Sequence, residues 1–381
     1  MKFIHLADLH LGKRLNGFSL MEDQRFILDQ ILRITEETQP DVVMIAGDVY
    51  DRSVSSEEAV RLLDDFLYGL SELGVRTMMI SGNHDSAERI AFGGRLMRRS
   101  GVSISPVYDG RIQCEEVDDE WGPVKIWLSP FLRPSGVRAA LPDEEIGDYT
   151  DAMRAVLGLM DMNPAARNIA VAHQFVVAGA HSPETCDSEI LSDGGLDSVD
   201  ASVFEGFDYV ALGHLHGPQG IGRETVRYAG SPLKYSFSEI AQEKGVTVGE
   251  MDGEGNVTIR MRALKPFREL RERKGTFAEL TAAVLPDDER QDYYRVILTD
   301  EQDVPEAMAR LRIYYPNLML LDYDNRRTRS TAAVELTEDA EERTPMELFE
   351  LLYEQQNGQP MDSSQHEIAD RLIREIWEEE I

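Results

Sequence analysis

Residues 42–51, VVMIAGDVYD, decide the fold. The apolar run ends abruptly at Gly47, and the carboxylates Asp48 and Asp51 follow. An apolar run rich in β-branched residues that stops at Gly and Asp is typical of a buried strand that passes into a loop. Ligands of open α/β sheets collect at the carboxyl ends of the strands, so the two carboxylates are candidates for a functional site. An ordinary Gly-Asp turn is the alternative for the pentapeptide GDVYD on its own.

Strands and helices alternate on both sides of this stretch. Apolar periodicity predicts strands at Phe3–Ala7 and Val75–Ile80, helices at Met21–Glu37 and Glu88–Arg99, and a helix from Ser55 with Glu58 in a capping box. Later segments are short and alternate between apolar and polar residues, as antiparallel strands do. They are Val102–Val107, Arg111–Val117 and Val124–Leu128. This pattern predicts an α/β fold (α+β in its later part), a β-sandwich of two mixed sheets with helices outside.

Three parts are expected along the chain. The two-sheet domain covers residues 1–264, and the restart of the strand–helix pattern indicates a small α/β domain at residues 265–329. A polar linker and two helices, about Pro345–Gln356 and Gln365–Glu379, make up residues 330–381. Two short helices cannot bury their own apolar faces. They either pack back on the chain's own domains or dock on a partner.

The composition excludes several classes of protein. With 381 residues, 42% of them hydrophobic, the chain suits one large globular domain and one or two small ones. Two cysteines, Cys114 and Cys186, cannot form a disulfide framework. The start MKFIHLADLH has the features of neither a secretory signal nor a membrane span. We therefore expect a cytoplasmic protein without membrane contact.

The charge of the chain bears on its partners. A net charge of −31 argues against nucleic acid, because polyanions are bound by basic surfaces. Part of this charge lies in the tail, where residues 338–381 hold 14 acidic and 3 basic residues, a net −11. Local arginines and bound cations can therefore still attract a phosphate backbone elsewhere on the chain.

Polar side chains gather at the ends of predicted strands in four further motifs. These are DLH with Asp8 and His10, GNHD with Asn83 and His84, AHQF with His173, and GHLH with His214 and His216. Carboxylate, amide and imidazole ligands without thiolate suit Mn²⁺, Fe or Zn²⁺. Such a set exceeds the needs of one ion, so it predicts two ions about 3.5–4 Å apart, the arrangement suited to attack on a phosphate ester. For His173 taken alone, an ordinary core histidine is the alternative.

The motifs DLH, GDVYD, GNHD, AHQF and GHLH, in this order, resemble the calcineurin-like metallophosphoesterase superfamily. The rest of the chain, including PMELFELLYEQQNGQPM near the C-terminus, resembles its bacterial SbcD branch of nuclease subunits. The resemblance implies exonuclease action on duplex DNA ends and endonuclease action on single strands or hairpins, in DNA repair and recombination. It also implies an SbcC-like, SMC-type ATPase as partner, and a homodimer within a heterotetramer at the nucleoid.

The same resemblance assigns the site residues. The first ion takes Asp8, His10, Asp48 and His216, and the second takes Asp48, Asn83, His173 and His214. Asp48 thus bridges two divalent ions, foremost Mn²⁺, with Mg²⁺, Fe or Zn²⁺ as alternatives. His84 matches the histidine that faces the scissile phosphate and stabilises its charge or protonates the leaving oxygen. Asp51 matches an aspartate that orients this histidine in related phosphatases, and an ordinary turn carboxylate is the alternative.

Contacts to the DNA backbone need cations near the strand ends. The candidates are Lys13, Arg14, Arg52 and Arg89, with Arg326, Arg327 and Arg329 in the run NRRTR. Solvated surface is the alternative for each of them. The resemblance further implies that the small domain caps the active site, and that the two C-terminal helices dock on the coiled-coil base of the ATPase.

Two other functions stay open on the sequence. One is a metallophosphoesterase that acts on phosphoproteins or small phosphodiesters, which the acidic charge suits. The other is a non-catalytic scaffold for the ATPase, which the complete set of ligand residues disfavours.

Overall fold

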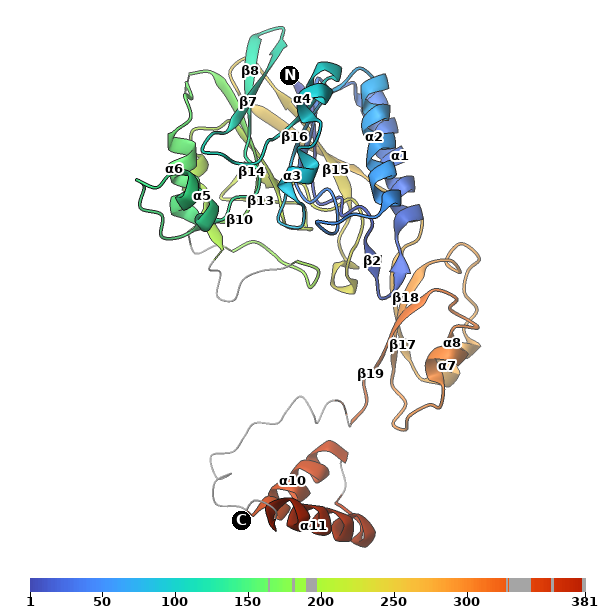
Figure 1. Ribbon diagram of the computed structural model, residues 1–381. Helices are drawn as coiled ribbons and strands as arrows, with labels where there is room; N and C mark the ends of the chain where they lie inside the picture. The colour runs from blue at the N-terminus through green and yellow to red at the C-terminus, as the bar shows by residue number, and fades with distance from the viewer. Residues whose placement is uncertain are drawn as a thin grey trace. The chain divides into compact units, whose positions relative to one another are not determined.

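The computed structural model describes residues 1–163, 165–179, 182–189, 197–326, 328, 344–357 and 360–378. Two compact units make up the chain, Met1–Arg268 and Glu269–Ile381. The predicted boundary after residue 264 lies close to this division, and the one after residue 329 lies outside the described residues. Sheets flanked by helices form the first unit (Figure 1).

The first sheet contains the strand that opens the sequence analysis. Its order is β16-β15-β1-β4-β5-β6. The strands are β1 (Lys2–Leu6), β4 (Val42–Ala46), β5 (Arg76–Ile80), β6 (Val102–Ile104), β15 (Gly245–Met251) and β16 (Val257–Ala263). The strands β1, β4, β5 and β6 run parallel, whereas β15 and β16 are added antiparallel. Parallel strands are covered on both faces, which explains why every residue of β4 is apolar and buried.

The second sheet has the order β13-β14-β12-β9-β8-β7. Its strands are β7 (Gln113–Asp119), β8 (Gly122–Leu128), β9 (Arg167–His173), β12 (Tyr209–Gly213), β13 (Gln219–Ile221) and β14 (Arg223–Tyr228). The inner strands β8, β9, β12 and β14 run parallel. Buried side chains of β1, β4 and β5 form one core with those of β8, β9 and β12, so the two sheets pack face to face.

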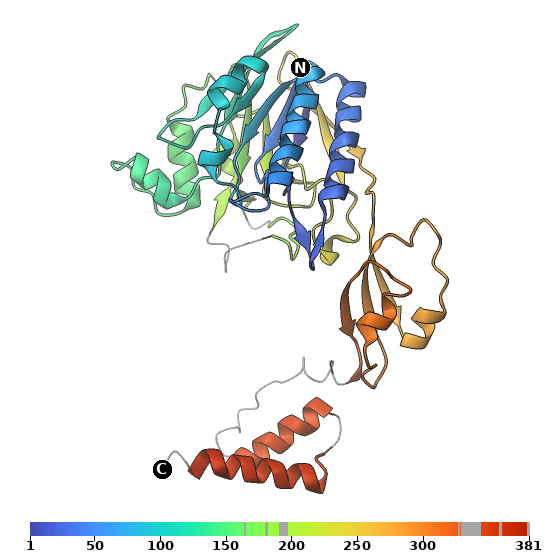
Figure 2. The same ribbon diagram turned by 45° about the vertical axis from the view of Figure 1, so that its right-hand side comes forward.

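Helices cover the outer faces of both sheets (Figure 2). On the first sheet lie α1 (Met21–Thr38) and α2 (Glu57–Glu72), each of which buries one apolar stripe. On the second lie α5 (Pro134–Ala140) and α6 (Tyr149–Gly158), whose apolar residues join a second core cluster. This arrangement confirms the predicted α/β class and the two-sheet sandwich flanked by helices.

Short elements complete the first unit. They are β2 (Arg14–Leu15), β3 (Phe18–Ser19), β10 (Phe175–Val177), β11 (Ser198–Asp200), α3 (Ala87–Ile90) and α4 (Gly94–Met97). The prediction of one continuous helix at 88–99 is wrong, because Gly93 takes a φ of 75° and separates α3 from α4. The N-cap of α2 is Ser56 rather than Ser55, and the Ser56 hydroxyl accepts a hydrogen bond from the N–H of Ala59 at 3.2 Å. The prediction of antiparallel pairing for β6 is also wrong, since β6 runs parallel to β5 at the sheet edge.

A buried ion pair ties the β7–β8 hairpin to the start of β9. Asp119 receives two hydrogen bonds from the guanidinium of Arg167, at 2.7 Å and 2.6 Å. The exposed fractions of the Asp119 and Arg167 side chains are 6% and 7%. Arg167 holds the pKa of Asp119 well below its usual value, although burial opposes this shift. The pair therefore stabilises the folded chain as long as Asp119 is ionised.

The Asp119→Asn variant is expected to lose about 3–5 kcal/mol of unfolding free energy at pH 7, because a buried guanidinium loses its counter-charge. The folded-state pKa of Asp119 is depressed, so the stabilisation is present above the unfolded-state pKa of about 3.9 and is lost as the pH falls further. Urea unfolding therefore measures the free energy of unfolding of the variant and of the unmodified chain at pH 7 and at pH 3. The difference between the two chains should be smaller at pH 3. The exposed neighbour Asp118, changed to Asn, serves as control, and a pH-independent difference would contradict the prediction.

The second unit begins with a parallel sheet of the order β17-β18-β19. Its elements are β17 (Leu270–Gly275), α7 (Phe277–Ala282), β18 (Tyr293–Leu298), α8 (Ala307–Leu311) and β19 (Leu318–Tyr323). Side chains of both helices and of the sheet share one small core. These elements lie within residues 265–329, where the sequence predicts a small α/β domain.

Two helices, α10 (Pro345–Asn357) and α11 (Ser363–Glu378), end the described chain and contact each other. Several of their apolar side chains stay exposed, among them Phe349 with 43% and Ile368 with 50% of its surface. In the described part of the chain no helix combines the length and hydropathy that a membrane span requires.

Candidate metal centre

The predicted metal ligands converge where strands of both sheets end. Asp8 and His10 follow β1, Asp48 follows β4, Asn83 follows β5, His173 ends β9, and His214 and His216 follow β12. All of these side chains except that of Asn83 are buried. Buried ionisable groups are costly unless they are paired or coordinate a metal ion. Their concentration at one place therefore needs a functional explanation.

The backbone here adopts conformations that most residues avoid. Seven non-glycine residues of the described chain have a positive φ, and four of them are Asp8, His10, Asp48 and His214, with φ of 53°, 43°, 48° and 107°. Such conformations cluster at functional sites, because the surrounding structure must enforce them. Backbone hydrogen bonds from Asp8 to Gly47 at 3.1 Å and from His10 to Asp48 at 2.9 Å hold the two loops together.

Two glycines allow these loops to approach each other. A Cβ on Gly213 would lie 1.9 Å from the carbonyl oxygen of Ala46 and 2.7 Å from Nδ1 of His173. A Cβ on Gly82 would lie 2.1 Å from Oδ1 of Asp48. Both distances are far below van der Waals contact. Any side chain at these positions would push apart the strand ends that carry the ligand residues.

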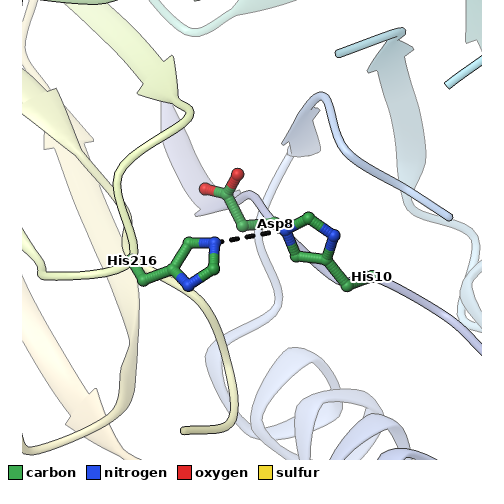
Figure 3. A group of neighbouring side chains, drawn as sticks. All are labelled: Asp8, His10 and His216. Atoms are coloured by element: carbon green, nitrogen blue, oxygen red, sulfur yellow. Dashed lines mark hydrogen bonds between the residues drawn. The ribbon is translucent and has the colours of Figure 1, made fainter. Parts of the chain in front are cut away.

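The first ligand group consists of Asp8, His10 and His216 (Figure 3). Nε2 of His10 lies 3.2 Å from Nε2 of His216 and 3.7 Å from Oδ2 of Asp48. Ligand atoms that sit about 2.0–2.2 Å from one ion lie roughly 3 Å from one another. The spacing of these nitrogen and oxygen atoms therefore suits a cation between them.

The second ligand group lies on the other side of Asp48. Oδ1 of Asn83 is 3.0 Å from Nε2 of His173 and 3.1 Å from Nδ1 of His214. Oδ2 of Asp48 is 3.4 Å from the same Nε2 of His173. Nδ1 of His173 donates to the carbonyl oxygen of Ala46 at 2.8 Å, which directs Nε2 toward the site. Asp48 thus borders both ligand groups.

The electrostatics of these side chains fit divalent metal ions. Burial raises the pKa of Asp8, lowers that of His10 and lowers that of His214 to about 3. Burial also opposes ionisation of Asp48, but His173 beside it holds the pKa of Asp48 well below its usual value, and Asp48 in turn raises the pKa of His173 to about 9. Nδ1 of His10 and Nε2 of His214 are buried without a hydrogen-bond partner among the described residues. His10 and His214 as neutral imidazoles and Asp48 as an ionised carboxylate have the forms that bind metal ions, whereas Asp8 and His173 would each have to lose a proton when a cation binds.

His84 lies at the open side of the first group. Its backbone N–H donates to Oδ1 of Asp48 at 2.9 Å, and its Nε2 is 4.0 Å from Oδ2 of Asp48. Nδ1 of His84 is hydrogen-bonded to the backbone carbonyl of Asp51 at 3.0 Å. The carboxylate of Asp51 instead accepts from Nζ of Lys13 at 2.8 Å. The contact that orients His84 thus comes from the backbone of Asp51, and a role for its side chain remains a prediction.

The cation candidates lie in different surroundings. Lys13 bonds to Asp51 and lies 5.4 Å above the ring of Tyr235, whereas Arg52 is 81% exposed with its Nε 3.7 Å from Oδ2 of Asp51. Arg14 and Arg89 are exposed in the first unit, Arg326 is exposed in the second, and Arg327 and Arg329 lie outside the described residues. The structure therefore brings Lys13 and Arg52 to the loop that carries Asp48, and phosphate contact stays a prediction for all seven.

Asp85 is a structural residue of the site that sequence reasoning did not single out. Its carboxylate accepts hydrogen bonds from the N–H groups of Val49 at 3.0 Å, Tyr50 at 2.9 Å and Gly82 at 2.9 Å. Burial and the charge of Asp48 raise the pKa of Asp85 to about 6. The loops after β4 and β5 are joined through this one side chain. In the sequence, only the position of Asp85 in the motif GNHD pointed to a role in the site.

A further polar network, without any sequence motif, lies behind His216. The hydroxyl of Ser188 donates to Oε1 of Glu239 at 2.7 Å and accepts from Nδ1 of His216 at 2.8 Å. Glu189 accepts the backbone N–H of His216 at 2.6 Å, and Lys244 donates to Oε2 of Glu239 at 2.6 Å. The network leaves the lone pair of His216 Nε2 facing the first ligand group.

The Ser188→Ala variant is expected to bind divalent metal about 10- to 100-fold more weakly, because His216 loses the partner that orients its ring. Isothermal titration with Mn²⁺ measures this affinity. Ser55→Ala, which changes a serine with a single long bond to the carbonyl of Arg52 at 3.5 Å, is the matched control. Unchanged Mn²⁺ affinity in Ser188→Ala would show that the network does not support the ligand.

Comparison with known families places this site in a class. The family model of the calcineurin-like phosphoesterases matches residues 1–218, which is more than half of the chain and contains every ligand candidate. A second model, described as the type 5 capsule protein repressor C-terminal domain, matches residues 266–357. Fold, site and family model together define a metallophosphoesterase.

Two curated relatives show which family of metallophosphoesterases the chain resembles. The SbcD subunit of the nuclease SbcCD from Staphylococcus epidermidis is 37% identical over 329 residues, which cover 84% of this chain and 85% of that protein. The SbcD subunit of the nuclease SbcCD from Staphylococcus saprophyticus is 35% identical over 326 residues, 84% of either chain. The chain belongs to the SbcD family of calcineurin-like phosphoesterases, as the sequence motifs predicted.

Proposed function

We propose that this chain is a nuclease subunit that hydrolyses DNA phosphodiesters with two divalent metal ions, foremost Mn²⁺. The observation that carries the proposal is the position of Asp48 between two ligand groups, with Nε2 of His10 at 3.7 Å and Nε2 of His173 at 3.4 Å from its Oδ2. One carboxylate shared by two ions is the arrangement that phosphoester hydrolysis uses. The name of the relatives, which are subunits of the nuclease SbcCD, supports DNA as the substrate.

When bound, the two ions activate water and neutralise charge on the phosphate. The side chain of His84 is assigned to the phosphate and the leaving oxygen. The carbonyl of Asp51, 3.0 Å from Nδ1 of His84, sets the ring orientation and leaves Nε2 free. When His84 is protonated, Nε2–H donates a hydrogen bond to the phosphate or a proton to the leaving oxygen. Lys13 and Arg52 supply positive charge beside the site, against the net −31 of the chain.

We further propose that the chain works with an SbcC-type ATPase, as the joint name SbcCD of the relatives implies. The exposed apolar residues of α10 and α11 support docking of these helices on the coiled-coil base of that partner. A homodimer within a heterotetramer, DNA positioning by the small α/β domain and a role in repair and recombination belong to the same proposal.

A chain truncated before Thr344 is expected to lose co-purification with the ATPase, because it lacks both helices. The truncated chain should keep its Mn²⁺ affinity, since the ligand residues lie in the first unit. Full recovery of the complex after truncation would refute the docking site.

One assay separates the candidate functions. Release of nucleotides from linear duplex DNA is measured in Mn²⁺, with and without the ATPase, beside a phosphomonoester substrate. Turnover of DNA supports the nuclease, and turnover of the phosphomonoester alone would indicate a small-substrate phosphatase. A chain that binds Mn²⁺ but hydrolyses neither substrate, with or without the ATPase, would be a scaffold.

A further inference from the structure

A pocket adjoins the second ligand group and is not used in the mechanism above. Its volume is about 290 Å³. We call it the side pocket, and the residues that line it include Asn83, Asp85, Tyr108, Phe131, Arg133 and Val137. Because Asn83 belongs to both, the side pocket lies directly beside the second ligand group.

One wall of the side pocket is an aromatic ring that contacts a ligand residue. The ring centroids of Phe131 and His173 are 6.2 Å apart in an edge-to-face arrangement. The N–H of Phe131 donates to the carbonyl of Ser81 at 2.9 Å, so the loop after β8 is tied to the loop that carries Asn83. The position of Phe131 is therefore coupled to that of the ligand residues.

A cation lies over the same ring. The guanidinium carbon of Arg133 is 5.6 Å from the ring centroid of Phe131. Arg133 is exposed, whereas Phe131 is partly buried. An aromatic ring with an arginine beside it is the combination that proteins use to bind nucleobases through stacking while they attract the adjoining phosphate.

Tyr108, one of the residues that line the side pocket, carries a polar atom without a partner. The hydroxyl oxygen of Tyr108 is buried and has no hydrogen-bond partner among the described residues. A buried hydroxyl without a partner destabilises the folded chain, so such groups usually serve a ligand or an ordered water. Because this oxygen is buried, a planar ligand with polar edges in the side pocket would supply the partner once the Tyr108 ring turns toward it.

We propose that the side pocket binds the nucleobase of the nucleotide next to the scissile phosphate. The base stacks on Phe131, its polar edge pairs with the hydroxyl of Tyr108, and Arg133 contacts the neighbouring phosphate. This inference rests on the proposed nuclease function and names a subsite for it.

The size of the side pocket restricts the substrate. At 290 Å³ it lies at the lower limit of ligand pockets, which range from about 300 to 1,000 Å³, and it accepts one base and not a base pair. The nucleotide at the scissile bond must therefore leave its partner strand before hydrolysis. Frayed ends, hairpin loops and single strands meet this condition with the smallest loss of base pairing and stacking.

The first test removes the base from the substrate. Single-stranded oligonucleotides carry one tetrahydrofuran abasic residue, placed in turn on either side of a chosen phosphodiester, and are hydrolysed by the full Mn²⁺-loaded chain. Base stacking contributes about 1–3 kcal/mol, so kcat/KM for the bond beside the abasic residue is expected to fall about 5- to 150-fold for one of the two placements. Equal kcat/KM for every placement and for the unmodified oligonucleotide would overturn the side pocket as a base site.

The second test changes the side pocket. The ratio of kcat/KM between the unmodified and the abasic oligonucleotide measures how much the base contributes. In Phe131→Ala this ratio should fall below about twofold. In Tyr108→Phe it should lie between the ratio of Phe131→Ala and that of the unmodified chain. Phe92→Ala and Tyr68→Phe, at positions 86% and 65% exposed, are matched controls that should keep the full ratio. A full ratio in Phe131→Ala would overturn the assignment of this ring.

A binding measurement separates this inference from the nuclease proposal. Isothermal titration of the Mn²⁺-loaded chain compares deoxyadenosine 5′-monophosphate with 2-deoxyribose 5-phosphate, and the nucleotide should bind about 5- to 150-fold more tightly. If DNA is hydrolysed but the base adds no affinity, the side pocket fails and the nuclease stands. If DNA is not hydrolysed in the presence of Mn²⁺ and the ATPase, both proposals fail together.

Discussion

Asp48→Asn is expected to lower DNA hydrolysis by about a thousandfold or more and to weaken the binding of both metal ions. Asp48 borders both ligand groups, so loss of its charge removes an interaction of several kcal/mol at each, where 1.36 kcal/mol corresponds to a tenfold change in rate. The amide oxygen of asparagine can still accept the hydrogen bond from the N–H of His84, so the loop should keep its conformation.

Isothermal titration with Mn²⁺ and hydrolysis of linear duplex DNA measure the two effects of Asp48→Asn. The change Asp64→Asn, at an exposed position of α2, is the control for an equal loss of charge and should leave both quantities unchanged. An Asp48→Asn chain that still binds two ions and hydrolyses DNA within tenfold of the unmodified rate would show that neither ligand group needs the charge of Asp48.

His84→Ala is expected to keep both metal ions and to lower kcat about 10²- to 10⁴-fold, the usual contribution of a general acid. The side chain of His84 is 18% exposed and is not needed to complete either ligand group, so metal affinity should change little.

His84→Gln is the companion variant, because glutamine can still donate a hydrogen bond to the phosphate but cannot transfer a proton. Recovery of activity in His84→Gln would assign His84 a charge-stabilising role, and no recovery would assign it proton transfer. Turnover at the unmodified rate in His84→Ala, with metal bound, would exclude His84 from the mechanism.

Much of the fold could be predicted because its signals are local. The apolar run before Gly47 and the alternation of strand and helix patterns predict a buried parallel sheet, and the structure has that sheet at β1, β4 and β5. The helices α1 and α2 follow from their apolar stripes. The family could also be predicted, since its motifs occupy short stretches directly after strands.

One error of prediction has a local cause, and the others come from contacts between segments that are distant in sequence. A single glycine, Gly93, interrupts a helix whose apolar pattern continues across it. The direction of β6 depends on its partner β5, and alternation along one strand contains no information about the partner. The networks around Asp85 and Ser188 were missed because each joins segments that are unrelated in sequence.

The sequence by itself determined which residues are available for metal chemistry and that they follow strands. Only the tertiary structure decided how they are grouped, because His10 and His216 are 206 positions apart and meet through the packing of two sheets at Gly213. It also decided which atoms are in contact, since the backbone carbonyl of Asp51, and not its carboxylate, bonds to His84. Local side-chain patterns specify strands and helices, whereas distances between strand ends depend on sheet order, register and close packing across the whole domain.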